Sequence, residues 1–350
     1  MPSVLDSLNT ALHRAMTLDP TVYILGEDIL DPYGGAFKVC RGLSTSFPDR
    51  VLTTPISEAG ITGIAAGMAL RGLRPVVEIM FGDFTTLIAD QLINHAAKFR
   101  GMYNDQVRVP LVVRTPMGGR RGYGPTHSQT LEKLYLGAPG LQVIAPCALS
   151  LPAKEGELPE LAPGSPGDIL LKTILDGEDP VLFVENKLLY PLNLQDETSL
   201  ADFSIQAFYG KDQRNPVFQL GIAGAPKADL TIAAYGYMAE LARQAALKLA
   251  YEHELFAELI VPTRLSPVDI SATLESVRRT GRLITVEEGT LTAGWGAEAL
   301  ARTAAALGPA LRFARRVAAL EMPIPASRPL EETALPGIPE IMTAALDLPG

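Results

Sequence analysis

Short apolar, β-branched segments alternate with helical patterns along most of this chain. Helical patterns lie between the segments, around residues 61–70, 85–99 and 169–175. Continuous apolar strands separated by helices are typical of a parallel sheet that is buried on both faces. The sequence therefore predicts an α/β fold with a doubly wound, mostly parallel sheet. Its candidate strands in the first half are residues 22–26, 51–54, 75–80, 109–114, 142–145 and 181–185.

The alternation is interrupted twice and then resumes, which predicts two domains in a chain of 350 residues. Residues 151–168 contain four prolines and three glycines, so we expect a Pro/Gly-rich surface insertion. Residues 191–227 are polar and rich in turn residues, and we expect a linker there. The predicted domains are residues 1–190 and 228–350. The second has candidate strands at 229–235, 255–261, 283–287 and 312–318.

Composition excludes several classes of protein. A net charge of −9 argues against a nucleic-acid partner, which requires a basic surface. No apolar run is long enough to span a membrane, and we expect no signal peptide. The two cysteines, Cys40 and Cys147, have no metal-ligand spacing. They suit a reducing compartment, so we expect a cytoplasmic protein.

Glu58 is the most informative polar residue, because it lies where a predicted strand gives way to a helix. Ligands usually bind at that edge of a parallel α/β sheet. Two interpretations remain open from the residues alone. Glu58 is either a charge that stabilises the start of the helix, with Ser57 as the N-cap, or a catalytic group.

Two further loops after predicted strands contain candidate functional residues. Phe84 follows the strand at 75–80 and is either a core residue or part of a site. His127 lies in the glycine-rich loop 118–129, and such loops often carry function. The glycine spacing matches neither a dinucleotide nor a P-loop motif. Arg120 and Arg121 would contact an anion, a partner chain or only solvent.

Several separated blocks, in this order, resemble one family. They are residues 55–63 (PISEAGITG), 73–78 (LRPVVE), 90–98 (DQLINHAAK), 127–129 (HSQ), 139–143 (PGLQV) and 179–181 (DPV). From about residue 4 to about residue 345, the chain resembles the β subunit of the thiamine-diphosphate-dependent decarboxylase component of 2-oxo acid dehydrogenase complexes. Pyruvate, branched-chain and acetoin enzymes belong to this group. The resemblance implies a pyrimidine-binding domain followed by a transketolase C-terminal-type domain.

The resemblance also assigns functions to residues. The Glu58 carboxyl group would hydrogen-bond N1′ of the cofactor's aminopyrimidine and favour the imino tautomer, whose N4′ removes the proton from thiazolium C2. Phe84 would pack on the aminopyrimidine, with Ile56 and Met80 as neighbouring apolar contacts. His127 would orient the substrate and assist acyl transfer to a lipoyl group.

The family's potassium site has matching positions in this sequence, whereas its Mg²⁺ site does not. Some members hold a potassium ion through backbone carbonyls, and the matching positions are Leu111, Ile174, Leu175, Gly177 and Asp179. The Gly-Asp-Gly segment with a later Asn that holds Mg²⁺ and the diphosphate is missing. We therefore expect an α subunit to complete the site in an α₂β₂ assembly, which would serve a lipoyl acyltransferase core.

Three functions stay open at this level. The first is a catalytic β subunit that decarboxylates a 2-oxo acid oxidatively together with an α subunit. The second is one half of a split transketolase-like enzyme that acts on sugars. The third is a non-catalytic structural subunit of the same fold. The spacing of the blocks around Glu58 and His127 favours the first, and a non-catalytic subunit would need neither residue.

Overall fold

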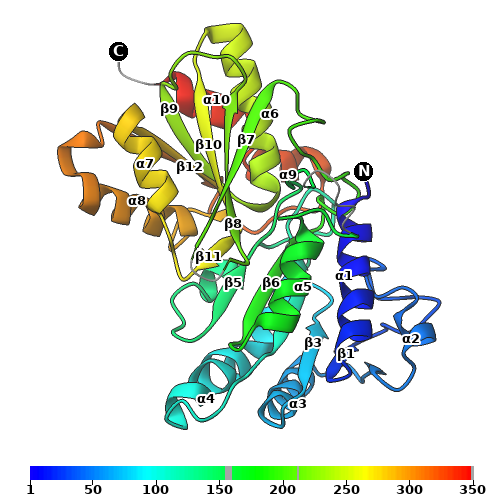
Figure 1. Cartoon of the computed structure of the whole chain (residues 1–350). Coiled ribbons are helices and arrows are strands. Elements are labelled where there is room, and N and C mark those ends of the chain that lie inside the picture. Colours follow the sequence, from blue (N-terminus) through cyan, green and yellow to red (C-terminus); the bar gives the residue numbers. More distant parts are fainter. Residues whose placement is uncertain (154–159, 211–212, 348–350) are drawn as a thin grey trace.

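The computed structural model describes residues 1–153, 160–210 and 213–347. It consists of two α/β units, each built around its own sheet (Figure 1). The first sheet has seven strands in the order β11-β5-β6-β4-β3-β1-β2. All of its strands from the first half of the chain run parallel. The bounds are β1 Val22–Gly26, β2 Val51–Thr53, β3 Arg74–Glu78, β4 Val112–Met117, β5 Gln142–Ile144, β6 Val181–Asn186 and β11 Arg264–Ser266.

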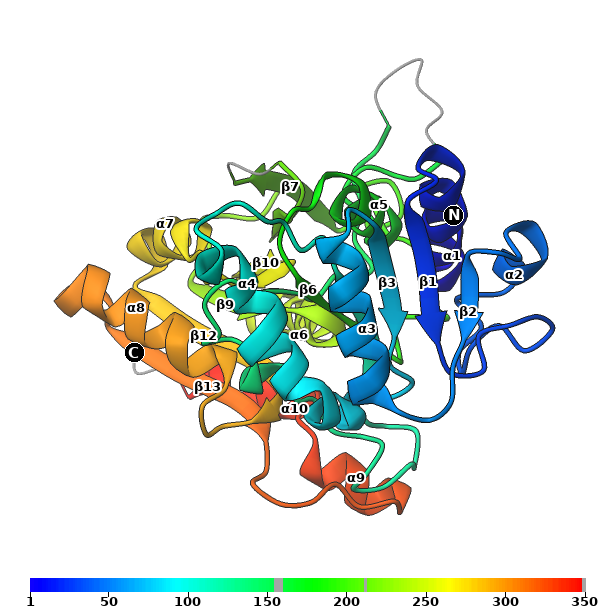
Figure 2. The same ribbon diagram turned by 90° about the horizontal axis from the view of Figure 1, so that it is seen from below.

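Helices cover both faces of the first sheet (Figures 1 and 2). The side chains of Val76 and Val112 point to one core, while those of Val77 and Val113 point to the other, as the two-residue period of a strand requires. One face is covered by α1 (Val4–Leu18) and α5 (Pro166–Asp176). The other is covered by α3 (Glu58–Leu70), η1 (Gly82–Ile88), η2 (Asp90–Ala96) and α4 (Ala97–Met102).

The second sheet has six strands in the order β13-β12-β9-β10-β8-β7. Helices α6 (Gly236–His253) and α10 (Ile338–Leu346) pack in one core, and α7 (Ser271–Thr280) and α8 (Trp295–Leu307) in another. That second core is continuous with the α3 side of the first sheet, so the two units share buried surface. The strand bounds are β7 Phe203–Tyr209, β8 Pro216–Ile222, β9 Leu230–Ala234, β10 Ala257–Pro262, β12 Arg282–Thr290 and β13 Phe313–Ala319.

The predicted α/β class is confirmed, but the expected linker is partly wrong. Residues 203–209 and 216–222 of the 191–227 stretch are β7 and β8, which pair antiparallel in the second sheet. Ser204 and Gln206 of β7 face outward while Phe203 and Ile205 are buried. Such half-exposed strands look polar in sequence, which explains the error. Strand β11, which crosses from the second unit to the first sheet, was also missed.

Three boundaries differ from the predictions. Strand β4 begins at Val112 rather than 109, because Pro110 has no N–H for the ladder. The single helix expected at 85–99 is divided into 3₁₀, π and α segments. The expected insertion 151–168 ends early, since Ser165 caps α5 and residues 166–168 form its first turn. Residues 154–159 of that insertion lie outside the described residues.

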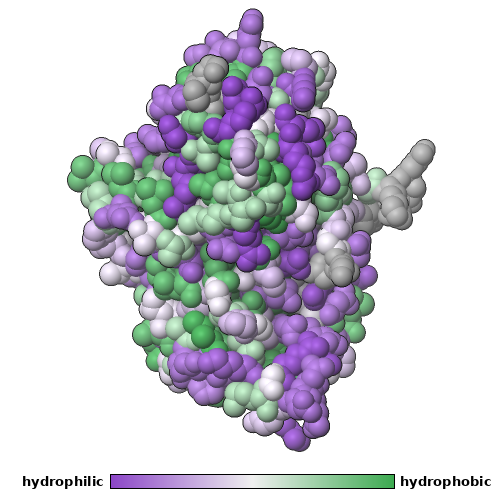
Figure 3. All heavy atoms as spheres, turned by 90° about the vertical axis from the view of Figure 1, so that its left-hand side faces the viewer, coloured by the Kyte–Doolittle hydropathy of each residue, from purple (hydrophilic) through white to green (hydrophobic). Residues whose placement is uncertain are grey.

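The surface bears apolar residues in places. Figure 3 shows them gathering over the face that carries α8, where Ala301, Ala304, Ala305 and Ala306 are exposed. Within the part of the chain that the structure describes, no helix has the length and apolarity to cross a membrane.

A buried ionic network joins the central strands of the first sheet. Arg114 on β4 is 1% exposed, and its guanidinium donates to both carboxylate oxygens of Glu185 on β6, each at 2.8 Å. It also donates to Glu78 on β3 at 3.0 Å. Tyr190 donates to Glu185 at 2.7 Å and Cys40 to Glu78 at 3.1 Å, so both carboxylates are solvated by the protein.

Replacing Arg114 with methionine should lower the free energy of unfolding by about 3–5 kcal/mol, because two buried carboxylates would lose their counter-charge. Urea denaturation followed by circular dichroism measures this. Arg328→Met is the control, since that arginine pairs with Glu332 on the surface and should unfold like the wild type. An Arg114→Met protein as stable as the wild type would contradict the prediction.

Candidate active site

Glu58 is the first residue of α3 and is only 8% exposed. Ser57 occupies the N-cap position, but its hydroxyl makes no capping hydrogen bond, so the expected side-chain cap is absent. No residue in the described ranges hydrogen-bonds or ion-pairs with the Glu58 carboxylate. Its oxygens remain open to solvent, unlike Oε1 of the neighbouring Glu27, and are therefore available to hydrogen-bond a ligand.

A second carboxylate lies beside Glu58. Glu27 follows β1, and burial together with the negative charge of Glu58 raises its pKa, while a backbone hydrogen bond from Ser57 lowers it. The Glu27 Oε1 atom is buried and has no partner among the described residues. Two carboxyl groups therefore lie close together at this strand-to-helix edge.

Aromatic rings pack around His127 at the same edge. Its imidazole meets Phe81 at a centroid distance of 4.7 Å and Phe84 at 5.3 Å, both edge-to-face. Tyr123 packs on Phe81 at 5.9 Å. Phe84 belongs to η1, which contacts α3, so the structure brings the segments of Glu58, Phe84 and His127 together.

The other two residues expected here are more open. Ile56 is 85% exposed, and Met80, just after β3, is half-buried. Both lie in the segments that lead from strands β2 and β3 into α3 and η1, and therefore border Glu58 and Phe84 in the chain. The exposed Ile56 shows that this side of the site faces outward in the single chain.

The glycine-rich loop before His127 is held by the second unit. Glu288 on β12 accepts from the Gly119 N–H at 2.6 Å. Glu331, on α9 (Arg328–Ala334), accepts from the N–H groups of Arg120 and Gly122 at 2.7 and 3.1 Å. A Cβ at Gly119 would lie 2.5 Å from a Leu335 methyl group, so any larger residue here would need the Leu335 side chain to shift.

The end of the loop is held by the first unit. Gln129 donates its side-chain amide to Asp83 at 2.8 Å. Lys187, the residue after β6, donates to the main-chain carbonyl of His127. The sequence contained only weak signals for these groups: Phe81 was one of two aromatics at a strand end, and Lys187 directly follows an apolar strand.

The residues expected to hold potassium do not form an open ring of carbonyls. Arg74 donates to the carbonyls of Ile174 and Gly177, both at 2.8 Å, and so caps the C-terminus of α5 with a positive charge. The carbonyl of Leu111 accepts from Val181, and Asp179 pairs through its side chain with Arg100. A second cation beside the Arg74 guanidinium would be repelled.

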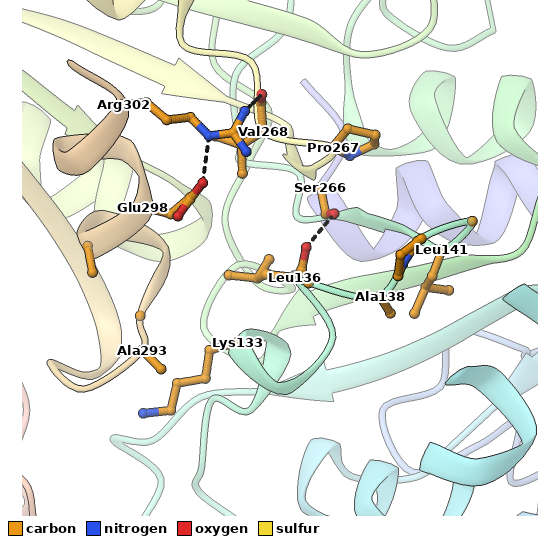
Figure 4. Close-up of a pocket in the computed structure, with 15 residues that line it drawn as sticks. Lys133, Leu136, Ala138, Leu141, Ser266, Pro267, Val268, Ala293, Glu298 and Arg302 are labelled. Carbon is orange, nitrogen blue, oxygen red and sulfur yellow. Dashed lines mark hydrogen bonds and ion pairs between the residues drawn. The ribbon is translucent and has the colours of Figure 1, made fainter. Parts of the chain in front are cut away.

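Other cavities lie away from this edge. One of about 520 Å³ lies between the loop at residues 133–141, β11 and α8 (Figure 4). Its charged groups are already paired, since Arg302 binds Glu298 and the Val268 carbonyl, and Lys133 binds Thr290 and Thr292. Another of about 700 Å³ borders α4. Neither is lined by Glu58, Phe84 or His127.

Comparison with known proteins identifies the class first. Residues 1–149 match the transketolase pyrimidine-binding domain and residues 223–341 the transketolase C-terminal domain. The structure resembles a chain described as "split gene transketolase, inactive beta4 tetramer" with a TM-score of 0.70. The likeness covers 99% of this chain and 98% of that one, at 20% identity, and shows the fold alone.

Sequence relatives then identify the family. The chain is 38% identical, over 98% of its length and 85% of the relative, to the mitochondrial pyruvate dehydrogenase E1 component subunit beta-1 of Oryza sativa subsp. japonica. It is 34% identical to the acetoin:2,6-dichlorophenolindophenol oxidoreductase subunit beta of Cupriavidus necator, over 97% and 95%. The chain belongs to this family, the β subunits of the thiamine-diphosphate-dependent decarboxylase component of 2-oxo acid dehydrogenase complexes.

Exchanging potassium for sodium at equal ionic strength should leave the melting temperature unchanged, because Arg74 already supplies a cation at the α5 carbonyls. Differential scanning fluorimetry measures this, with choline chloride as the control salt. A rise in melting temperature that saturates with potassium alone would indicate binding to the folded state and contradict the prediction.

Proposed function

We propose that this chain is the β subunit of a two-chain enzyme that decarboxylates a 2-oxo acid oxidatively and passes the acyl group to a lipoyl domain. One observation carries the proposal: the mostly buried Glu58 has no protein partner among the described residues, lies beside Glu27, and opens the helix that contacts η1, which carries Phe84 of the aromatic cluster. This arrangement suits a polar heteroaromatic ligand that satisfies the carboxyl group and stacks on a ring.

The residues fit the pyrimidine half of thiamine diphosphate. Glu58 would hydrogen-bond a ring nitrogen, and Phe84, Ile56 and Met80 would contact the ring. When bound, thiamine diphosphate supplies an acidic carbon and an electron sink for decarboxylation. Glu58, held at the start of a helix, would move a proton to and from the ring nitrogen, and Glu27 would keep that proton close by.

His127 would work on the substrate side of the site. Its imidazole is held edge-on by Phe81 and Phe84, and its Nδ1 lies 2.9 Å from the Thr126 hydroxyl. This leaves Nε2 as the atom to orient an anionic substrate or to transfer a proton during acyl transfer. The resemblance of the surrounding sequence blocks to the family supports that assignment.

Glu58→Gln should leave the fold intact and reduce decarboxylation by at least about 100-fold, because an amide cannot exchange the proton. The substitution also removes a like charge beside Glu27, so the melting temperature should not fall. The assay is dye reduction by the chain together with its α subunit, with Glu298→Gln on the distant helix α8 as control. Turnover near that of the wild type would refute the mechanism.

An α subunit would supply the diphosphate half of the site. No group of three or more potential metal ligands (His, Cys, Asp or Glu) was found among the described residues. Helix α3, which begins at Glu58, exposes Gly63 and Gly67 further along, and no atom of another described segment lies within 4 Å of a Cβ built at Gly67. Glycine inside a helix costs about 1 kcal/mol relative to alanine, so an external helix packed on this surface explains both.

The isolated chain should bind thiamine diphosphate at least about 100-fold more weakly than the two-chain complex, because losing the Mg²⁺ and phosphate contacts costs more than 2.7 kcal/mol. Isothermal titration calorimetry with Mg²⁺ present measures both affinities. Gly67→Leu should block assembly and leave the isolated chain folded, with Ala305→Leu, at an exposed position of the distant helix α8, as a comparison. Tight binding to the chain alone would overturn the shared site.

The alternatives receive less support. The split-transketolase likeness is at 20% identity, whereas relatives at 34–38% are dehydrogenase and acetoin oxidoreductase β subunits. A structural subunit would have no use for an unpartnered Glu58. The lipoyl acyltransferase partner and the cytoplasmic location remain part of the proposal, since the rice relative is named as mitochondrial.

A further inference from the structure

Lys187 is a fully buried lysine that contacts the aromatic cluster around His127. Its relative exposure is 0%, and it makes no salt bridge within the described part of the chain. Burial is the main reason that its pKa falls to about 8, and the carboxylates of Asp83 and Glu288 offset this in part. A protein that keeps an unpaired lysine in its interior accepts a loss of stability there.

The ammonium group contacts both parts of the His127 environment. It donates to the main-chain carbonyl of His127. It also lies over the ring of Phe81 at 5.1 Å and that of Tyr123 at 5.5 Å. Phe81 is the ring that meets the imidazole at 4.7 Å. The Lys187 side chain therefore contacts both the backbone of His127 and the Phe81 ring against which the imidazole packs.

We propose that Lys187 is a positioning residue that fixes His127 in the active site by holding its main-chain carbonyl and the Phe81 ring from beneath. This inference rests on the proposed function of His127, but the placement itself is independent of cofactor and partner. Lys187 does not touch the substrate, because no part of its side chain reaches the surface. It acts through His127.

The direction in which Lys187→Met changes protein stability distinguishes this proposal from a purely structural role. The folded-state pKa of about 8 lies below the ordinary 10.5, so the cost of burying the charge is full below pH 8 and is relieved as pH rises toward 10.5. Methionine has a similar length and no charge. Lys187→Met should therefore keep or raise the melting temperature at pH 7 while it displaces His127.

Nuclear magnetic resonance of the full chain with labelled histidines tests the placement directly. The chain has four histidines, so each ring gives a resolvable signal, and His127→Asn assigns one of them. Lys187→Met should shift the His127 signals and leave the other three in place. Lys172→Met is the matched control, because Lys172 pairs with Asp168 on the surface of α5. Lys187→Arg, which keeps the donor and the charge, should restore most of the wild-type spectrum.

A second measurement needs no variant. In the wild type, the His127 signals should show an inflection near pH 8 that the other histidines lack, as Lys187 loses its proton. Four other charged groups face Lys187. They are Asp83 from η1, Glu288 from β12, Glu331 from α9 and Arg121 from the loop.

The activity of the two-chain enzyme tests the functional consequence of this proposal. Lys187→Met should lower kcat by about 10–100-fold with little change in KM, as expected when a catalytic group is misplaced by a fraction of an ångström to 1 Å. Unchanged His127 signals, or wild-type kcat in Lys187→Met, would overturn the proposal. So would a lower melting temperature with shifts at all four histidines. A wild-type pair without decarboxylase activity would instead refute the proposed function and leave the NMR result standing.

Discussion

The Arg114 network is the constraint on which the rest of the site depends. It ties β3, β4 and β6 together through the carboxylates of Glu78 and Glu185 in the interior. Strand β3 ends at Glu78 itself, three residues before Phe81, while β4 and β6 end directly before Gly118 and Lys187. The position of the aromatic cluster therefore follows from the register of three strands that one guanidinium holds in place.

The second unit helps to position the site, although Glu58, Phe84 and His127 all belong to the first unit. Glu288 and Glu331 bind the backbone of the glycine-rich loop that leads to His127. Strand β11 pairs with β5 in the first sheet, which fixes the two units relative to each other. This explains why the loop is rich in glycine: its backbone must approach both carboxylates and Leu335 closely, and no phosphate is needed to account for it.

The single chain is incomplete in a specific way. The candidate site edge contains Glu58, whose carboxyl group has no partner among the described residues, and the exposed Ile56. The adjoining helix presents glycines that the chain's own packing does not use. Both features agree with the proposed site, in which a second chain would close over α3 and enclose the ligand between the two chains.

The sequence by itself determined the α/β class and most strands, because apolar periodicity is a local property, and its motifs led to the proposal of Glu58, Phe84 and His127 as site residues. It could not reveal β7 and β8, whose outward residues look polar, or β11, whose partner is 120 residues away. It also placed potassium at carbonyls that Arg74 occupies. Only the tertiary structure decided these points, and only it brought Lys187 beneath His127, because hydrogen bonds and burial between distant segments leave no spacing in the chain.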